Sequence, residues 1–450
     1  METPAGKLNL PAKNLKDAFN ACDPSAPLDD DDPRYVDLAS GRGDEGNAVE
    51  QCRKRIIRSD RPCVQLFAGH RGCGKSTELR RLHKLLKQDN YFVVRFEVHR
   101  DLDLQDTEPA DVLLALIRNL EEHLRKSPFQ LSQKLLNDFE AWFGETILDT
   151  SESRQMEAAV SSEVRLGADV PLLAKLMARV TGQIRTGTES KKSVRLKLDP
   201  QVSQLVDRGK ILVSNARSQI QQAGYKDLVM IVDNLDRVVP VSKGNARTSH
   251  DVLFIERGDL LKGFGCHTII TVPISLFFSP KGALLNNIFP YRHIVPMVKV
   301  ATQDHQKWHP GYQLLEEVLG RRLDVDSLLE KDVAQRLIEM SGGHPRQLMN
   351  LMLFSMDFVD EPPVTLVAVE KAIKRFKTDY DRMIPENHWP LLAQVHLNQK
   401  VLNDEDHQLM LFNLSVLEYE NDDRWCDVQP AIRELARFQA ELGKTKKILT

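Results

Sequence analysis

Apolar and polar positions follow two kinds of pattern along the chain, and these predict strands separated by helices. Apolar runs of strand length lie at residues 63–68, 91–98, 228–232, 268–272 and 293–300. Apolar residues recur at helical spacing within 45–58, 77–86 and 109–142. The run at 228–232 has no polar interruption, as expected of a strand buried on both faces. Strands alternating with helices predict an α/β fold with a parallel sheet sandwiched by helices.

The last ninety residues have a different pattern. Helical stretches at 365–376, 389–397 and 407–414 precede two strand-like runs at 415–420 and 424–428. Helices followed by a hairpin predict a winged-helix-like domain. Residues 361–450 carry 12 basic and 15 acidic residues, and acidic side chains crowd the expected wing at Glu418, Glu420, Asp422, Asp423 and Asp427. Because negative charge repels phosphates, we expect this domain to bind a protein or to autoinhibit rather than to bind DNA.

These changes of pattern predict the domain boundaries. Residues 1–58 form an N-terminal extension, 59–300 the core with an insertion at about 150–200, 301–360 a helical lid, and 361–450 the winged-helix-like domain. Within the insertion, residues 179–197 carry six basic residues and one acidic residue. This stretch is either a solvated face or flexible insertion, or a contact for nucleic acid or an acidic partner.

Composition contributes mainly by exclusion. With 42% hydrophobic residues, 28% charged residues and a net charge of −3, the chain is an ordinary globular sequence. It has no run of eighteen apolar residues, so no membrane span is expected, and its first ten residues lack the pattern of a signal peptide. The six scattered cysteines form neither a disulfide framework nor a C-x-x-C pair. We therefore expect a cytoplasmic protein.

A phosphate-binding motif lies between the first predicted strand and the helix at 77–86. It reads Gly69, His70, Arg71, Gly72, Cys73, Gly74, Lys75, Ser76 and Thr77, which is the pattern G-x-x-x-x-G-K-[ST]. Its glycines let successive N–H groups turn toward phosphates, and the start of the helix adds partial positive charge. Lys75 is expected to reach the β- and γ-phosphates, and Ser76 to bind Mg²⁺. No guanine-recognition signature follows, so ATP is the expected nucleotide.

The strand at 228–232 ends in a second chemical signal. Asp233 is expected to hold Mg²⁺ together with Ser76, because a carboxylate at a strand tip beside a phosphate loop is the usual second anchor. Many related ATPases place glutamate next, but this chain has Asn234, and an amide cannot accept a proton. Asp236 is the nearby carboxylate that could activate water. We expect slow hydrolysis, which Asp236→Ala should abolish while sparing ATP binding.

Two arginines are candidates for contact with the γ-phosphate, where a guanidinium stabilises the charge of phosphoryl transfer. Arg346 follows Gly342-Gly343-His344-Pro345 at the start of a predicted lid helix, and Arg292 directly precedes the strand at 293–300. The alternative for each is a surface salt bridge. Tyr35 and Val36, upstream of the loop, are candidates for the pocket of the base.

The order and spacing of these motifs resemble AAA+ or STAND-class P-loop ATPases over residues 35–360. The resemblance implies that Arg346 senses the γ-phosphate in cis, that Arg292 is a finger on a neighbouring subunit's nucleotide, and that Thr271 occupies the sensor position. Families more often have Asn or Arg where Thr271 stands. More narrowly, the chain resembles bacterial ATPases of mobile elements and antiphage defence and, in outline, the origin-recognition (Orc/Cdc6-like) ATPases.

Two functions follow as hypotheses. The first is an ATP-binding, slowly hydrolysing switch that forms homo-oligomers or a hetero-complex and controls an effector protein encoded nearby, in antiphage defence. The alternative is a nucleic-acid-binding AAA+ ATPase of origin-recognition or transposition-regulator type, which would use the basic stretch 179–197. A protein-unfolding motor is disfavoured because the sequence has no aromatic pore-loop element at the expected place.

Overall fold

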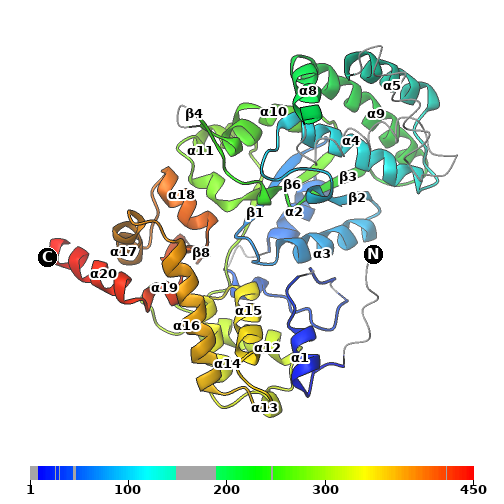
Figure 1. The fold of residues 1–450 in the computed structure, drawn as a ribbon. Helices are drawn as coiled ribbons and strands as arrows, with labels where there is room; N and C mark the ends of the chain where they lie inside the picture. Colours follow the sequence, from blue (N-terminus) through cyan, green and yellow to red (C-terminus); the bar gives the residue numbers. More distant parts are fainter. Residues whose placement is uncertain are drawn as a thin grey trace.

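The computed structural model describes residues 9–25, 27–29, 31–43, 47–147, 189–244, 247–421 and 423–449. Most of the insertion expected at 150–200 lies outside these ranges, including the part of the basic stretch before residue 189. Figure 1 shows the sheet and its helices in blue, cyan and green, the lid helices in yellow, and the C-terminal helices in orange and red.

A five-stranded parallel sheet forms the centre of the core. Its strands are β1 (Val64–Gly69), β2 (Phe92–Glu97), β3 (Leu228–Asp233), β6 (His267–Pro273) and β7 (Arg292–Val295), in the order β2-β3-β6-β1-β7. This confirms the α/β fold with a parallel sheet. The last strand is shorter than the predicted run 293–300, because Pro296 has no N–H to donate to a neighbour. The next residues leave the sheet, and the Met297 N–H bonds to the Glu418 carbonyl at 3.1 Å.

Helices cover both faces of this sheet, and each face has its own apolar core. One face is covered by α2 (Ala48–Ile57) and α3 (Lys75–Gln88), and the other by α4 (Pro109–Arg125), α9 (Val202–Gln222) and α10 (Gly258–Lys262). Outside these lie α5 (Gln133–Ile147), α8 (Glu189–Leu198), α11 (Gly282–Ile288) and the short pair β4 (Ser242–Gly244) and β5 (Arg247–Thr248). The start of α4 has a capping box between Glu108 and Asp111, with Pro109 in the first turn.

The lid consists of α12 (His309–Gly320), α13 (Val325–Leu328), α14 (Val333–Ser341) and α15 (Pro345–Met356). The N-terminal segment does not stand apart from it. Helix α1 (Leu15–Ala21) lies beside the lid helices (Figure 1), and Ala12 pairs with Leu323 in a short parallel bridge. Ala18, Cys22 and Leu38 are buried in the lid's apolar core. The lid core is therefore completed by residues from the start of the chain.

The C-terminal part contains α16 (Leu366–Met383), α17 (His388–Asn398), α18 (Glu405–Phe412), the antiparallel pair β8 (Val416–Glu420) and β9 (Arg424–Val428), α19 (Pro430–Arg433) and α20 (Ala436–Leu449). The helices and the hairpin lie where the sequence predicts them, and the winged-helix assignment stays a prediction. Trp389 and Phe438 are buried in its core. Among the described residues, every helix is too short or too polar to cross a lipid bilayer.

The prediction that the hairpin displays an acidic surface is wrong for three of its side chains. Glu418, Glu420 and Asp427 are buried rather than displayed on the surface. Arg424 lies 3.4 Å from Glu418 and 3.6 Å from Glu420, so two of these carboxylates share one guanidinium. The alternation of residues along a short strand does not reveal which of its two faces is buried, and both faces of this hairpin are largely buried. Three of the five acidic side chains expected to form a surface that repels phosphates are therefore buried.

Candidate nucleotide-binding site

The phosphate loop connects the end of β1 to the start of α3, as the sequence predicts. Gly72 and Gly74 have φ values of +87° and +106°, a region that side chains with a Cβ rarely adopt. A Cβ on Gly72 would also lie 2.6 Å from the His344 ring of the lid. Glycine at position 72 thus permits both the backbone turn and the close approach of the lid to the loop.

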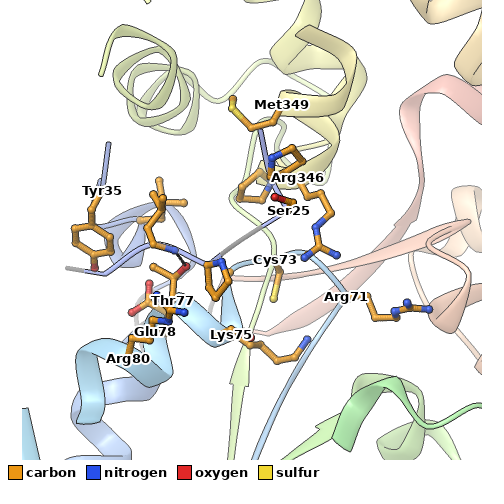
Figure 2. Close-up of a pocket in the computed structure, with 18 of the residues that line it drawn as sticks. Ser25, Tyr35, Arg71, Cys73, Lys75, Thr77, Glu78, Arg80, Arg346 and Met349 are labelled. Carbon is orange, nitrogen blue, oxygen red and sulfur yellow. Dashed lines mark hydrogen bonds between the residues drawn. The ribbon is translucent and has the colours of Figure 1, made fainter. Parts of the chain in front are cut away.

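A pocket of about 410 Å³ opens beside this loop. Five parts of the chain line it: loop residues 71–78, the end of β2 with the residues after it, the turn after β3, the lid around Arg346, and described residues between Asp23 and Arg42. Figure 2 shows Arg346 extending from the lid toward the loop, with Tyr35 on the opposite side from Arg71. The volume is within the range of small-molecule pockets, and the wall combines cations with loop backbone, which suits a polyphosphate.

Lys75 and Asp236 form a buried ion pair inside the pocket. The Lys75 Nζ lies 2.9 Å from Asp236 Oδ2, and both side chains are 6% exposed. The same ammonium group donates to the carbonyls of Gly69 and His70, each at 2.8 Å. A phosphate entering the loop would compete with Asp236 for this charge, so Asp236 lies within reach of the reacting end of a bound triphosphate.

Asp233 lies directly behind Ser76. The Ser76 hydroxyl donates to Asp233 Oδ1 at 3.1 Å, the Asn234 N–H donates to the same oxygen at 2.8 Å, and Arg95 lies 3.4 Å from Oδ2. A hydroxyl and a carboxylate are hard oxygen ligands and fit Mg²⁺. Burial, followed by the charge of Asp236, raises the pKa of Asp233 to about 6. Protons compete with a cation at this carboxylate as the pH falls through that value.

The turn after Asp233 is held by a residue expected to have another role. Asn234 has φ +67°, and the Leu235 N–H that follows donates to the Thr271 hydroxyl at 2.9 Å. That hydroxyl in turn donates to the Val232 carbonyl at 3.3 Å, and Thr271 is completely buried. Thr271 does not line the pocket, so the structure does not bring this sensor position to a phosphate. It orients the turn that carries Asp236.

Arg346 is brought to the pocket and Arg292 is not. Arg346 lines the pocket, where burial, followed by the charges of Arg237 and Arg71, lowers its pKa. These three arginines are among the eight that line the pocket in which a triphosphate would lie. Arg292 is exposed at the start of β7, hydrogen-bonded to Asn286 and lying over the Phe277 ring at 5.8 Å. A role for Arg292 in trans stays a prediction.

Part of the pocket wall has no sequence motif. Tyr35 and Val36 line the pocket as expected, but so do residues 23–25, 27 and 28, and Leu28 donates its N–H to the Thr77 hydroxyl at 3.3 Å. The buried Arg42 donates to the Cys73 carbonyl at 2.6 Å and so contacts the phosphate loop directly. Only the run of prolines and aspartates marked this segment, and it did not indicate a ligand.

Two buried histidines attach the phosphate loop to the rest of the molecule. His70 accepts the Glu418 N–H at Nε2 (2.9 Å) and donates from Nδ1 to the Leu411 carbonyl (3.2 Å) in the C-terminal part. His344 of the lid donates to the Arg71 carbonyl at 2.8 Å. Burial lowers the pKa of both rings to about 3, so both stay neutral. The lid and the C-terminal part thus each hold one loop residue.

Arg195, in the described part of the basic stretch 179–197, is paired with carboxylates. Arg195 is 11% exposed and lies 2.7 Å from Asp106 and 3.6 Å from Glu108, with Asp111 in closer contact. Three carboxylates therefore surround this guanidinium and hold α8 against the start of α4. Arg195 is thus engaged within the chain, and a contact of the stretch 179–197 with nucleic acid stays a prediction. Arg179 and Arg185 lie outside the described residues.

Comparison with known proteins finds solved structures that resemble this chain at low sequence identity. No protein-family model matches the chain, and no curated protein matches it. Three solved structures share 12% identity each: Cdc6p from Pyrobaculum aerophilum (TM-score 0.41, 96% of this chain, 99% of that one), the Orc1 protein from Aeropyrum pernix in complex with DNA (0.36, 89%, 92%), and the Walker-type ATPase Paby2304 from Pyrococcus abyssi (0.37, 89%, 95%). Two of these neighbours are thus a Cdc6 and an Orc1 protein.

Proposed function

We propose that this chain is a Mg²⁺-dependent ATPase whose nucleotide state changes the contacts between its core, lid and C-terminal part. The observation that carries the proposal is the pocket itself. Lys75, Ser76, Asp236 and Arg346 meet there from the loop, the turn after β3 and the lid, with Asp233 behind Ser76. Each has the chemistry that phosphoryl transfer needs: two cations, two metal-side oxygens and a carboxylate near the phosphate end.

The attachments of the loop support the second half of the proposal. Binding of a triphosphate draws Lys75 away from the carbonyls of Gly69 and His70 and attracts Arg346 from the lid. The same loop contains His70, which is hydrogen-bonded to the C-terminal part, and Arg71, whose carbonyl accepts a hydrogen bond from the lid. A change at the phosphates therefore acts on both neighbouring parts through direct hydrogen bonds, which is the physical requirement for a switch.

The test is mass photometry of the purified protein with Mg²⁺ and ADP, ATP or a slowly hydrolysed analogue, combined with limited proteolysis. Wild type is expected to change its oligomeric state or its cleavage pattern with ATP or the analogue but not with ADP. Arg346→Ala is expected to bind ATP and to lose this response, because the lid no longer detects the γ-phosphate. Arg292→Ala tests the predicted role of Arg292 as a finger on a neighbouring subunit's nucleotide. This variant should lose only the change of oligomeric state with ATP.

An identical mass and cleavage pattern with every nucleotide would contradict the switch, while ATP hydrolysis measured in parallel would still support the ATPase. Assembly that Arg292→Ala leaves intact would remove the trans role of that residue. The first sequence hypothesis, control of an effector protein in antiphage defence, would gain support from a nucleotide-dependent partner that co-purifies with wild type and is lost with Arg346→Ala.

A nucleic-acid-binding ATPase is the second candidate, and a basic surface favours it. We define this surface as Lys54, Arg55, Arg58, Arg61, Lys262 and Arg292. They line two adjoining hollows of about 610 and 380 Å³ around Tyr291, with Arg55 stacked 4.2 Å over its ring. In the described part of the chain the first four pair with no carboxylate. Unpaired cations beside an aromatic ring suit a phosphate backbone and its bases.

We expect salt-dependent binding of a labelled DNA duplex, measured by fluorescence anisotropy at several salt concentrations. Replacing Arg55, Arg58 and Arg61 with glutamine should reduce the slope of log affinity against log salt by about one per residue, since each phosphate contact releases a counterion. The matched control removes charge from the basic stretch instead, with Lys192→Gln and Lys197→Gln. Binding lost only in that control would assign the contact to α8, and no binding by wild type would rule this candidate out.

A further inference from the structure

His305, His396 and Asp427 form a group of two histidines and one carboxylate outside the nucleotide pocket. His396 Nδ1 is 2.7 Å from Asp427 Oδ1, and His305 Nδ1 is 3.5 Å from Asp427 Oδ2. One ligand atom from each residue lies within 4.8 Å of the other two. Within the described ranges, no other cluster of three or more His, Cys, Asp or Glu residues has this geometry.

The three residues come from separate segments. His396 lies in the last turn of α17, Asp427 in β9, and His305 in a turn at residues 301–307 between the core and the lid. His305 has φ +58°, an uncommon conformation for a residue with a side chain, and the turn is closed by the Thr302 N–H to the Gln306 carbonyl at 2.8 Å. The Gln399 side chain also donates to the Gln303 carbonyl. The turn is thus held against the C-terminal part with His305 aimed at Asp427.

The spacing fits a transition-metal ion. A tetrahedral ion with ligands at about 2.0–2.2 Å separates them by about 3–4 Å. The separation of 3.5 Å lies in that range and the one of 2.7 Å is shorter, so small side-chain shifts would admit an ion. Two imidazole nitrogens with one carboxylate oxygen are a ligand set that suits Zn²⁺. His305 is 40% exposed on its side chain, so the group is open to an ion and to water from the solvent side.

The Asp427 carboxylate is also held by a cation. Arg433 Nη1 lies 3.1 Å from Oδ2. Since Oδ1 is the oxygen nearest His396, Arg433 can hold Oδ2 in place as an outer-shell partner while Oδ1 binds an ion.

We propose that His305, His396 and Asp427 form a Zn²⁺ site that fastens the turn at 301–307 to the C-terminal part. The ion would replace two polar contacts, at 2.7 and 3.5 Å, which join residues 31 and 122 positions apart, with direct bonds to the metal. All six cysteines are buried, including Cys426 next to Asp427, so none offers an exposed thiol to the ion. This proposal does not depend on nucleotide binding.

The test measures Zn²⁺ on the full-length, chelator-stripped protein without nucleotide. Wild type, dialysed against Zn²⁺, is expected to hold one ion more per chain than His305→Ala/His396→Ala, by inductively coupled plasma mass spectrometry. His305→Ala alone, at an exposed position, should weaken binding at least tenfold. The matched control His309→Ala removes an exposed histidine four residues away and should leave the Zn²⁺ content unchanged. Co²⁺ should give a ligand-field spectrum in wild type that the double variant lacks.

Two results would overturn the site. One is a wild type that binds no Zn²⁺, and the other is a folded double variant that binds as much Zn²⁺ as wild type. The circular dichroism spectrum of each variant tests folding, and His305→Ala keeps the test valid if His396→Ala disturbs the packing of that ring against Phe438, whose centroid is 5.7 Å away.

Discussion

Asp236→Asn is expected to lower the rate of ATP hydrolysis by a factor of about 100 or more, the usual effect of removing a general base. Asp236 is the carboxylate that reaches into the pocket and contacts Lys75 at 2.9 Å, whereas the neighbouring Asn234 cannot accept a proton. The amide retains the shape of the side chain but removes the basic oxygen. ATP affinity should stay the same or rise, because the phosphates no longer compete with a carboxylate for Lys75.

Single-turnover hydrolysis and nucleotide titration, measured separately, check the two halves of this result. Glu97→Gln is the matched control, since Glu97 also lines the pocket but pairs with Arg95 at 3.8 Å and Arg100 at 3.6 Å. It should hydrolyse ATP much faster than Asp236→Asn. A normal rate in Asp236→Asn would show that another group activates the water.

Lys75→Ala is expected to weaken ATP binding about 30-fold or more, equivalent to about 2 kcal/mol or more, with hydrolysis lost in consequence. The ammonium group is 6% exposed, so its attraction to phosphate acts where water screens it little. Its removal also leaves Asp236 without its cation, so an uncompensated negative charge faces the incoming phosphates. Both effects act in the same direction.

Isothermal titration with ATP and with ADP measures this loss. Lys87→Ala is the control, because Lys87 is exposed in the last turn of the same helix, α3. This variant should bind both nucleotides as wild type does. Thermal unfolding of both variants separates a local loss of charge from a loss of folding. Unchanged ATP affinity in Lys75→Ala would contradict the assignment of the phosphate loop.

The core and the chemistry of the loop could be predicted because they depend on short stretches of chain. The phosphate loop needs glycine at fixed positions and a lysine and serine at the start of a helix, and all of these lie within nine residues. The order of strands and helices is likewise encoded by local periodicity, which predicted all five sheet strands to within a few residues except at Pro296. The position of Asp233 followed from the strand before it.

Burial and partners were not predictable in the same way. Glu418, Glu420 and Asp427 carry charge in the sequence, which favoured an acidic surface, but their burial depends on Arg424 and on His305 and His396. Arg195 belongs to a basic run in the sequence, but in the structure three carboxylates in and just before the start of α4 surround it. Opposite charges far apart in sequence leave no spacing pattern that reveals whether they meet.

The sequence by itself determined the α/β class, the phosphate loop and the identities of Lys75, Ser76, Asp233 and Asp236, because local backbone geometry and residue chemistry suffice for each. The tertiary structure alone decided that Arg42 and residues 23–25, 27 and 28 complete the pocket, that His70 and His344 join the loop to two other parts, and that Arg292 lies outside this pocket. The physical reason is that such contacts depend on packing between segments up to about 350 residues apart, and this packing arises only when the whole chain buries its apolar surface.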